Sequence, residues 1–315
     1  MRTNPILRIV LFSIALIFLL GVLGVGLGVT AYMTIGNSEQ TDEIHHTPQL
    51  QTDEQTGNQG SFADSEVYSV PASIRELGIE WAAGTITIAP SPNVTDIQVS
   101  ENFTGSDKYK MVCRQEGNKL DIRFSSETIR FPSFGVNTDS KDLVILVPSD
   151  WTCDALEIDA ASADVYVSGL TISQMDFDGA SGICNLENCT VYNMDVDAAS
   201  GEVIFSGHLD CLDFDGASGD CTLKLTNCPS SIDLDGMSGD LDITLPSDCG
   251  FIVNSEGLSS DFTTDFDIKT INGAHCHGDG SCRIEVDALS GRVCIRDGGY
   301  NCHATEDHGH HGSHH

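Results

Sequence analysis

A short phrase recurs along the second half of the chain at intervals close to 19 residues. Each copy places a serine, usually followed by glycine, after alternating apolar and acidic residues, as in LDFDGASGD from Leu212 to Asp220. The recurring serines are Ser162, Ser181, Ser200, Ser218, Ser238 and Ser290, and a degraded copy carries Ser259. A period of this length is too short for a repeat of two helices and is typical of one coil of a β-solenoid.

The copies also show the alternation of a strand that buries one face. In DLDITL (240–245), Leu241, Ile243 and Leu245 alternate with polar residues, and this period of two is typical of a half-buried strand. We expect each copy to form a strand, a tight turn at Ser-Gly and a second strand, with glycine supplying backbone angles that other residues adopt at a cost. The sequence therefore predicts an all-β fold, a parallel β-solenoid with coils of about 19 residues.

Stacked coils would align the aspartates of successive copies into two rows on the outer face. The expected rows are Asp176, Asp195, Asp213 and Asp233, and Asp178, Asp197, Asp215 and Asp235. Neighbouring strands lie about 4.8 Å apart, so the carboxylates of one row would repel each other. The rows are either a solvated face that protects strand edges or a ladder in which Ca²⁺, which prefers oxygen ligands, bridges neighbouring coils.

The phrase LDFDGASGD does not fit the loop of a helix–loop–helix calcium site. That loop has glycine at its sixth position and a bidentate Glu at its twelfth. Gly216 is instead the fourth residue counted from Asp213, and no further acid follows at the required spacing. The phrase is therefore interpreted as the turn of a repeat.

The charge balance argues against a nucleic-acid partner and against an enzyme. The formal net charge of −32 over 315 residues repels nucleic acid. A β-helix that cleaves acidic polysaccharide needs a basic residue near its carboxylates, yet Lys224 is the only Lys or Arg between Ser162 and Gly250. The sequence contains no nucleophile elbow, phosphate-binding glycine loop or zinc-protease motif. We therefore expect no catalytic residues.

The N-terminal residues have the composition of a membrane anchor. Residues 9–35 form a nearly uncharged apolar run, and a bilayer is crossed by about 20 such residues. Arg2 and Arg8 precede the run, which places residues 1–8 in the cytoplasm and the C-terminal domain outside, in a single-pass protein of the cell membrane. The alternative is a cleaved signal peptide that ends near Val29, Thr30 and Ala31.

Three further parts follow the anchor. Residues 36–65 are polar and without periodicity, so we expect a flexible linker. Residues 66–297 form the β-strand-repeat domain, and residues 298–315 are expected to be a disordered His-rich tail. If this tail is a metal site, its ligands for Zn²⁺ or Ni²⁺ would be His308, His310, His311, His314 and His315.

All 12 cysteines follow the predicted anchor, so disulfides formed in an oxidising compartment are expected. Four of them follow their turn serines by 8 to 11 residues and should form one column, at a separation that suits disulfides between neighbouring coils. These four are Cys189, Cys211, Cys228 and Cys249. By alternation, Cys184 and Cys221 should instead point inward as buried thiols.

A second group of cysteines lies near the end of the repeats. Cys276, Cys282, Cys294 and Cys302 are close enough in sequence to pair among themselves. The alternative is a zinc site formed by His275, Cys276, His277 and Cys282, although this spacing lacks the C-x-x-C pattern of zinc knuckles.

The residues before the repeats carry a recognisable order of phrases. IRELGIEWAAGTITIAP (74–90) is followed by DIQVSE (96–101), KLDIRF (119–124), DLVILVP (142–148) and LEIDAASADVYVSG (156–169). In this order the chain resembles the putative-adhesin family of bacterial β-strand repeats, a domain of unknown function, over residues 66–297. The resemblance implies a β-protein attached to the membrane or surface of a bacterial envelope, with no catalytic residue to transfer.

These observations favour a membrane-anchored, extracytoplasmic, adhesin-like module that binds without catalysis. Solenoids present extended surfaces to their partners, and the partner expected here is cell-wall polymer or a surface protein. The alternative is an envelope-stress or metal-sensing accessory protein that acts through a membrane partner.

Overall fold

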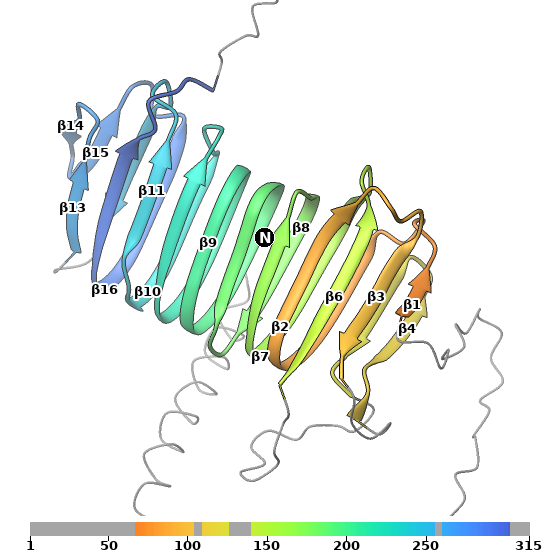
Figure 1. Ribbon diagram of the computed structural model, residues 1–315. Coiled ribbons are helices and arrows are strands. Elements are labelled where there is room, and N and C mark those ends of the chain that lie inside the picture. The colour runs from red at the N-terminus through yellow and green to blue at the C-terminus, as the bar shows by residue number, and fades with distance from the viewer. Residues whose placement is uncertain (1–66, 104–108, 126–139, 256–259, 303–315) are drawn as a thin grey trace, which may run out of the picture. The chain divides into compact units, whose positions relative to one another are not determined.

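The computed structural model describes residues 67–103, 109–125, 140–255 and 260–302. The elements in these segments are β-strands, and the expected all-β class is confirmed (Figure 1). None of the described segments is a helix with the length and apolarity to cross a bilayer. The predicted anchor (9–35), the linker (36–65) and the tail histidines from His308 to His315 lie outside the described residues.

The central coils stack in parallel with the expected period. They comprise β7 (Thr152–Ser168), β8 (Thr171–Gly179), β9 (Ile183–Leu225), β10 (Ser231–Ser238) and β11 (Leu241–Leu245). Thr152 lies opposite Thr171, and Thr171 lies opposite Thr190, so neighbouring coils are 19 residues apart. Parallel pairing of the repeats is therefore confirmed.

One row of inward-pointing residues illustrates how the repeats build the core. Val165 lies opposite Ile86 in one neighbouring coil and opposite Cys184 in the other. Further along the stack, Leu241 lies opposite Cys221. Each of these side chains is at most 1% exposed. The period-two alternation of the sequence thus becomes a continuous apolar interior.

The turn at Ser-Gly is part of a continuous strand within β9, at Ser200 and Ser218, whereas at Ser181 it separates β8 from β9. Its glycines are required by close approach between coils rather than by backbone angles. A Cβ on Gly219 would lie 2.6 Å from the carbonyl oxygen of Gly201, and one on Gly239 would lie 1.9 Å from that of Gly219. Among these turn glycines only Gly182 has a positive φ, of 123°. The expected conformational reason is therefore wrong for most of the turns.

At the N-terminal end of the stack, the spatial order of coils departs from the sequence order. The first coil, β2 (Glu76–Ser91), lies between β7 on one side and β5 (Lys119–Arg123) with β6 (Lys141–Pro148) on the other. Antiparallel strands then cover this end (Figure 1). They are β1 (Val67–Val70), β3 (Ile97–Asn102) and β4 (Val112–Glu116).

The C-terminal end has the same kind of inversion. The last coil in the sequence is β16 (Cys282–Asp297), which pairs with β10 and β11 on one side. On its other side it pairs with the degraded copy, formed by β12 (Phe251–Ser255) and β13 (Ser260–Thr264). The hairpin of β14 (Lys269–Ile271) and β15 (Ala274–His277) then pairs antiparallel with β12. Antiparallel strands therefore cover the edge of the parallel stack at both ends, an edge that the repeats alone would leave open.

A buried ion pair links two strands at the N-terminal end of the stack. The Lys141 side chain is 1% exposed, and its Nζ lies 2.6 Å from a carboxylate oxygen of Glu101, whose side chain is 8% exposed. The ammonium also donates to the carbonyls of Tyr109 and Phe124 and lies 4.1 Å from the centre of the Phe124 ring. Because a buried charge needs a counter-charge and hydrogen bonds, Glu101 joins β3 to β6.

Candidate binding face

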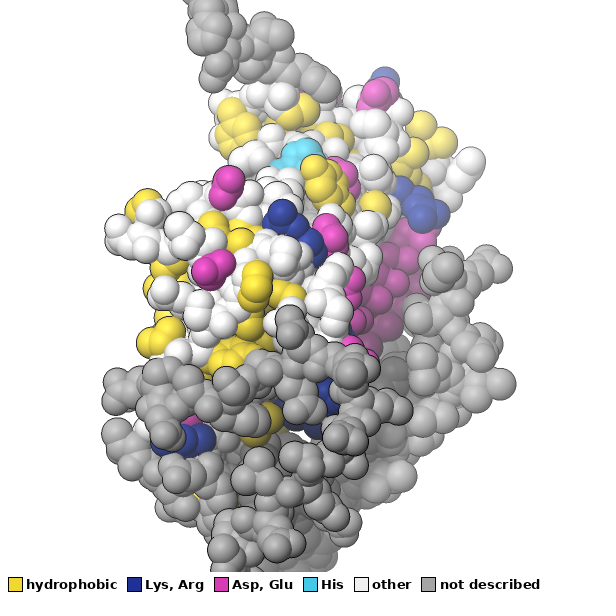
Figure 2. Space-filling view, turned by 90° about the vertical axis from the view of Figure 1, so that its right-hand side faces the viewer, with side chains coloured by type: hydrophobic (Ala, Val, Ile, Leu, Met, Phe, Trp, Pro, Cys, Tyr) yellow, Lys and Arg dark blue, Asp and Glu magenta, His cyan; other side chains and the backbone are white. Residues whose placement is uncertain are grey.

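The structure aligns the acidic residues of successive coils into the two predicted rows. Asp176 and Asp178 lie opposite Asp195 and Asp197, and Asp213 and Asp215 lie opposite Asp233 and Asp235. Within β9, a Cβ on Gly216 would lie 3.6 Å from the Ala198 carbonyl oxygen, so the neighbouring residues Asp215 and Asp197 lie in adjacent coils. Figure 2 shows the resulting band of acidic side chains on one side of the molecule.

The rows are longer than the repeats alone predicted. The Asp176 row gains Glu157 at one end and Glu285 at the other. The Asp178 row gains Asp159, then Glu80, at one end and Asp287 at the other. These additional acids come from β2, β7 and β16, the coils whose spatial neighbours are distant in the sequence.

Basic side chains pair with the acids at the two ends of this face. Lys119 Nζ lies 2.5 Å from a carboxylate oxygen of Glu157 and 3.7 Å from one of Asp121. Gly78 lies opposite Glu157, at the end of the Asp176 row, and its missing side chain leaves room for Lys119. A Cβ on Gly78 would lie 2.9 Å from the Lys119 Cε. At the opposite end, Arg283 lies 3.5 Å from Glu285.

Crowding of carboxylates raises the pKa values of the central acids. The pKa of Asp178 is raised to about 7, first by desolvation, then by the charges of Asp159, Asp197 and Asp176 and by a hydrogen bond with Asp159. Desolvation and neighbouring acids also raise the pKa values of Asp176 and Asp233. The face therefore holds more protons near neutral pH than separate aspartates would.

The rows do not form a calcium cage. Calcium takes six to eight oxygen ligands, whereas no group of three or more His, Cys, Asp or Glu side chains in the described segments is arranged to hold a metal ion. The rows offer opposed carboxylates on neighbouring strands instead. The calcium ladder stays a prediction, and any cation held there would keep most of its water.

A third set of acidic residues has a structural role that the sequence analysis missed. The Asp164 carboxylate accepts a hydrogen bond from the Ile183 backbone N–H at 3.0 Å, and Asp220 accepts one from Asp240 at 2.9 Å. Asp240 in turn accepts the backbone N–H of Arg292 at 3.0 Å and pairs with its guanidinium. The recurrence of Asp two residues after the turn serine, at positions 164, 220 and 240, was the available signal. This is the role of the last acid in LDFDGASGD.

The four turn cysteines do not form one column. Cys228 and Cys249 are joined by a disulfide, with their Cα atoms 5.2 Å apart, so a bond between neighbouring turns is present. Cys211 lies instead within a strand, opposite Ser231, and Cys189 is a buried thiol. The turns differ in length between coils, so a similar spacing from the serine does not place the cysteines at equivalent positions.

The inward-pointing cysteines behave as expected. Cys184 and Cys221 are 0% and 1% exposed and are free thiols. Burial raises the pKa values of both thiols, and the pKa of Cys221 reaches about 12. They are therefore core residues rather than reactive groups.

The residues of the candidate zinc site do not converge. His275 stacks on Phe262, with ring centres 4.5 Å apart, and His277 Nδ1 hydrogen-bonds the Asp267 carbonyl at 2.8 Å. Between them Cys276 points to the opposite face of β15 by strand alternation. Cys282 is a buried free thiol, as is Cys294, and Cys276 and Cys302 are also free.

Residues 298–302, which the sequence assigns to the expected disordered tail, are hydrogen-bonded to the repeats. The Tyr300 hydroxyl donates to the Leu225 carbonyl at 2.5 Å, and the Ser247 N–H donates to the Tyr300 carbonyl at 2.6 Å. The Cys302 N–H donates to Asp248 at 2.8 Å. These bonds attach residues 298–302 to the end of β9 and to the turn that follows β11.

Fold and face together define a β-solenoid repeat protein with a charged outer surface. The family model described as Toastrack DUF4097 matches residues 74–296. This chain therefore belongs to the Toastrack DUF4097 family, and the resemblance to a β-repeat family of unknown function is confirmed. No curated protein matches the chain.

Two solved structures are similar over 74% of this chain and 98% of their own. One, from Clostridium sporogenes, is described as a putative cell adhesion protein and is 11% identical, with a TM-score of 0.35. The other, from Bacteroides fragilis, is described as a putative adhesin and is 16% identical, with a TM-score of 0.41. Neither likeness is close enough to carry a functional argument.

Proposed function

We propose that this chain is a membrane-anchored extracytoplasmic protein whose β-solenoid is a non-catalytic, adhesin-like binding module at the cell surface. The observation that supports this proposal best is the run of carboxylates in register along the central coils. Charge complementarity fixes the register of a partner and speeds its encounter. The partner is a cationic polymer of the cell wall or a basic patch on a surface protein.

The anchor in this proposal is the apolar run of residues 9–35, preceded by Arg2 and Arg8. Such a run, with positive charges on its N-terminal side, places the C-terminal domain outside the cytoplasm. The polar residues 36–65 then separate the solenoid from the bilayer.

Binding of the full chain, purified in detergent, to isolated cell wall, whole cells and immobilised polylysine tests the proposal. A variant with Asp178→Asn, Asp197→Asn and Asp215→Asn neutralises the middle of one row. We expect its binding to fall at least about tenfold, because the partner loses adjacent charges, and we expect added salt to weaken binding by the wild-type chain.

The matched control neutralises three exposed acids outside the rows, with Asp150→Asn, Glu187→Gln and Glu202→Gln. Its formal net charge equals that of the row variant, but its rows are intact, so it should bind like the wild type. Equal loss in both variants would assign binding to net charge alone and contradict the proposal. Failure of the wild type to bind any of the three probes would favour the accessory protein that acts through a membrane partner.

A further inference from the structure

A hollow of about 510 Å³ opens beside the turn between β9 and β10. Its lining includes Cys228, Cys302, Ser281 and the hydrogen-bonded pair of His208 and Asp210. The hollow therefore brings a disulfide-bonded cysteine and a free thiol to the same opening. None of the aspartates of the acidic rows lines it.

The two sulfur atoms of the disulfide differ in access. Cys228 is half-buried and lines the hollow, whereas Cys249 is 1% exposed and belongs to the core. A nucleophile in the hollow therefore meets the Cys228 sulfur first, and Cys249 is the leaving thiol.

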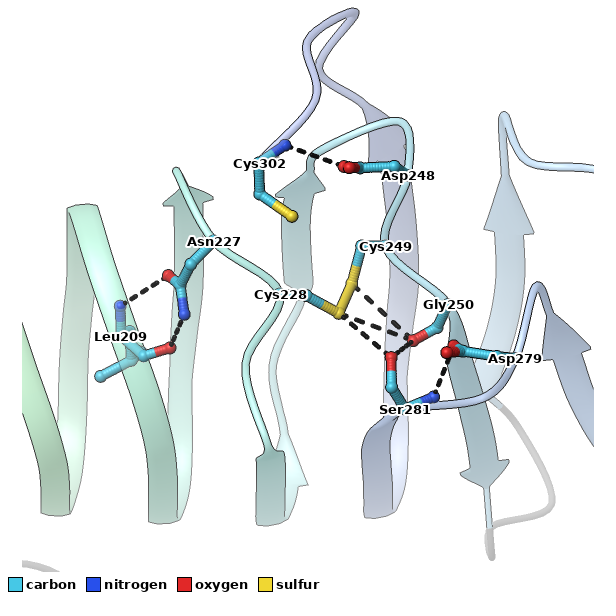
Figure 3. Close-up of a disulfide and its surroundings, with 9 residues drawn as sticks. All are labelled: Leu209, Asn227, Cys228, Asp248, Cys249, Gly250, Asp279, Ser281 and Cys302. Carbon is cyan, nitrogen blue, oxygen red and sulfur yellow. Dashed lines mark hydrogen bonds between the residues drawn. A yellow bond between two sulfur atoms is a disulfide. The ribbon is translucent and has the colours of Figure 1, made fainter. Parts of the chain in front are cut away.

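Cys302 is held next to this disulfide (Figure 3). Its backbone N–H donates to Asp248, the residue before Cys249, at 2.8 Å. Cys228 and Cys302 both line the hollow. Tyr300 fixes the segment through its bonds to Leu225 and Ser247. The third thiol is thus positioned by contacts on both sides of the disulfide.

We propose that Cys228, Cys249 and Cys302 form a thiol–disulfide exchange site. The Cys302 thiolate attacks the Cys228 sulfur, the bond from Cys228 to Cys249 breaks, and a Cys228–Cys302 disulfide forms. Cys249 leaves as a thiolate and takes up the proton that Cys302 lost. The step needs no oxidant or reductant, and it exchanges a cross-link between two turns for one that ties down the segment after β16.

Asp248 restrains this exchange. The pKa of the Cys302 thiol is raised, first by desolvation and then by a hydrogen bond with Asp248 and the charge of Asp248. The backbone amides of Cys228 and Cys302 lower this pKa, but by less. The thiolate is the attacking species. The other titratable groups that line the hollow are His208 and Asp210.

The test maps disulfides in the full chain after thiols are trapped by alkylation and the chain is digested without reduction. In Cys249→Ser, where dissolved oxygen oxidises the two remaining thiols, we expect the linked peptide that contains Cys228 and Cys302. In the wild type held at about pH 8.5, where thiols are more ionised, we expect the same peptide to appear beside the Cys228–Cys249 peptide. In Asp248→Asn, alkylation of Cys302 near pH 7 should be several-fold faster.

Cys211→Ser is the matched control, because Cys211 is a partly exposed thiol on a strand outside the hollow. Its linkages should equal those of the wild type. Circular dichroism establishes whether Cys249→Ser folds, and if it does not, the wild-type map decides alone. Absence of the Cys228–Cys302 peptide from the wild type and from a folded Cys249→Ser would overturn the proposal.

Discussion

In four coils, the size of an inward-pointing residue is inversely related to the size of the residue two positions later. A Cβ on Gly179 would lie 2.7 Å from the Phe177 ring, and one on Gly216 would lie 2.7 Å from the Phe214 ring. In two other coils the first residue is aliphatic and the second is alanine, whereas Leu234 is followed by Gly236. The pairs are Phe177 with Gly179, Phe214 with Gly216, Ile158 with Ala160 and Val196 with Ala198.

This matching predicts a conditional cost for a methyl group at position 216. Gly216→Ala should lower the free energy of unfolding by about 1–3 kcal/mol, the usual range for overpacking. In a Phe214→Leu background the same change should cost less than about 1 kcal/mol, because the ring is absent. Urea unfolding measures both values, and an equal cost in the two backgrounds would show that ring contact is not the cause.

The Asp220 carboxylate predicts a second effect at the scale of single residues. Asp220→Ala removes the acceptor for the Asp240 N–H and should cost about 1 kcal/mol. Asp220→Asn removes the same charge but keeps an oxygen acceptor, so it should retain most of the stability. Thermal unfolding of the two variants separates hydrogen bonding from charge. If Asn is as harmful as Ala, the hydrogen bond is not what matters.

Among the elements, the central coils could be predicted from the sequence and the two ends could not. A fixed offset of 19 residues together with strand alternation is enough to place Asp176 opposite Asp195. The position of β2 depends instead on pairs such as Glu76 with Ala155, and that of β16 on pairs such as Leu241 with Val293. Such distant pairs leave no periodic signal, because the intervening segments differ in length and are not repeats.

The candidate site was predictable to a similar degree. The rows depend on the regular strands, so the sequence located their central members. The cysteine column depends on turns of unequal length, so Cys189 and Cys211 were misplaced. The environment of Lys141 was also missed, because its partner Glu101 comes from another strand and a single lysine carries no pattern.

The ion pair that joins β3 to β6 predicts a large effect of one neutral substitution. Glu101→Gln leaves the Lys141 ammonium buried without its counter-charge and should destabilise the chain by about 3–5 kcal/mol. Combining it with Lys141→Met removes both charges and should recover a substantial part of that loss. Urea unfolding of the single and double variants measures the recovery, and a double variant no more stable than Glu101→Gln would contradict this explanation.

At the scale of the whole molecule, the acidic face predicts a response to divalent cations. Millimolar Ca²⁺ should raise the melting temperature by a few degrees, because cations reduce the repulsion between carboxylates along the rows. In a domain of this size, a shift of a few degrees corresponds to about 1 kcal/mol of free energy of unfolding. The control is NaCl at equal ionic strength. The variant with Asp178→Asn, Asp197→Asn and Asp215→Asn should respond less, and no calcium shift in the wild type would remove the calcium ladder.

The same crowding sets the sign of the pH dependence. The pKa of Asp178 is raised from 3.8 to about 7 in the folded chain, so the folded state binds more protons than the unfolded state between these values. Its contribution to the free energy of unfolding therefore falls as pH rises from about 4 to about 7. Asp178→Asn should stabilise the chain by about 0.5–1 kcal/mol near pH 8, the range for exposed like charges, and have little effect near pH 4.

A double-mutant cycle between Asp178 and Asp197 tests most directly whether windows 19 residues apart lie side by side with their carboxylates in contact. Near pH 8, Asp178→Asn and Asp197→Asn should together stabilise the chain by about 0.5 kcal/mol less than the sum of the single changes. The control pair, Asp178 with Asp215, spans two coils and should be additive within about 0.3 kcal/mol. Additivity of Asp178 with Asp197 would contradict the parallel register and the acidic face built on it.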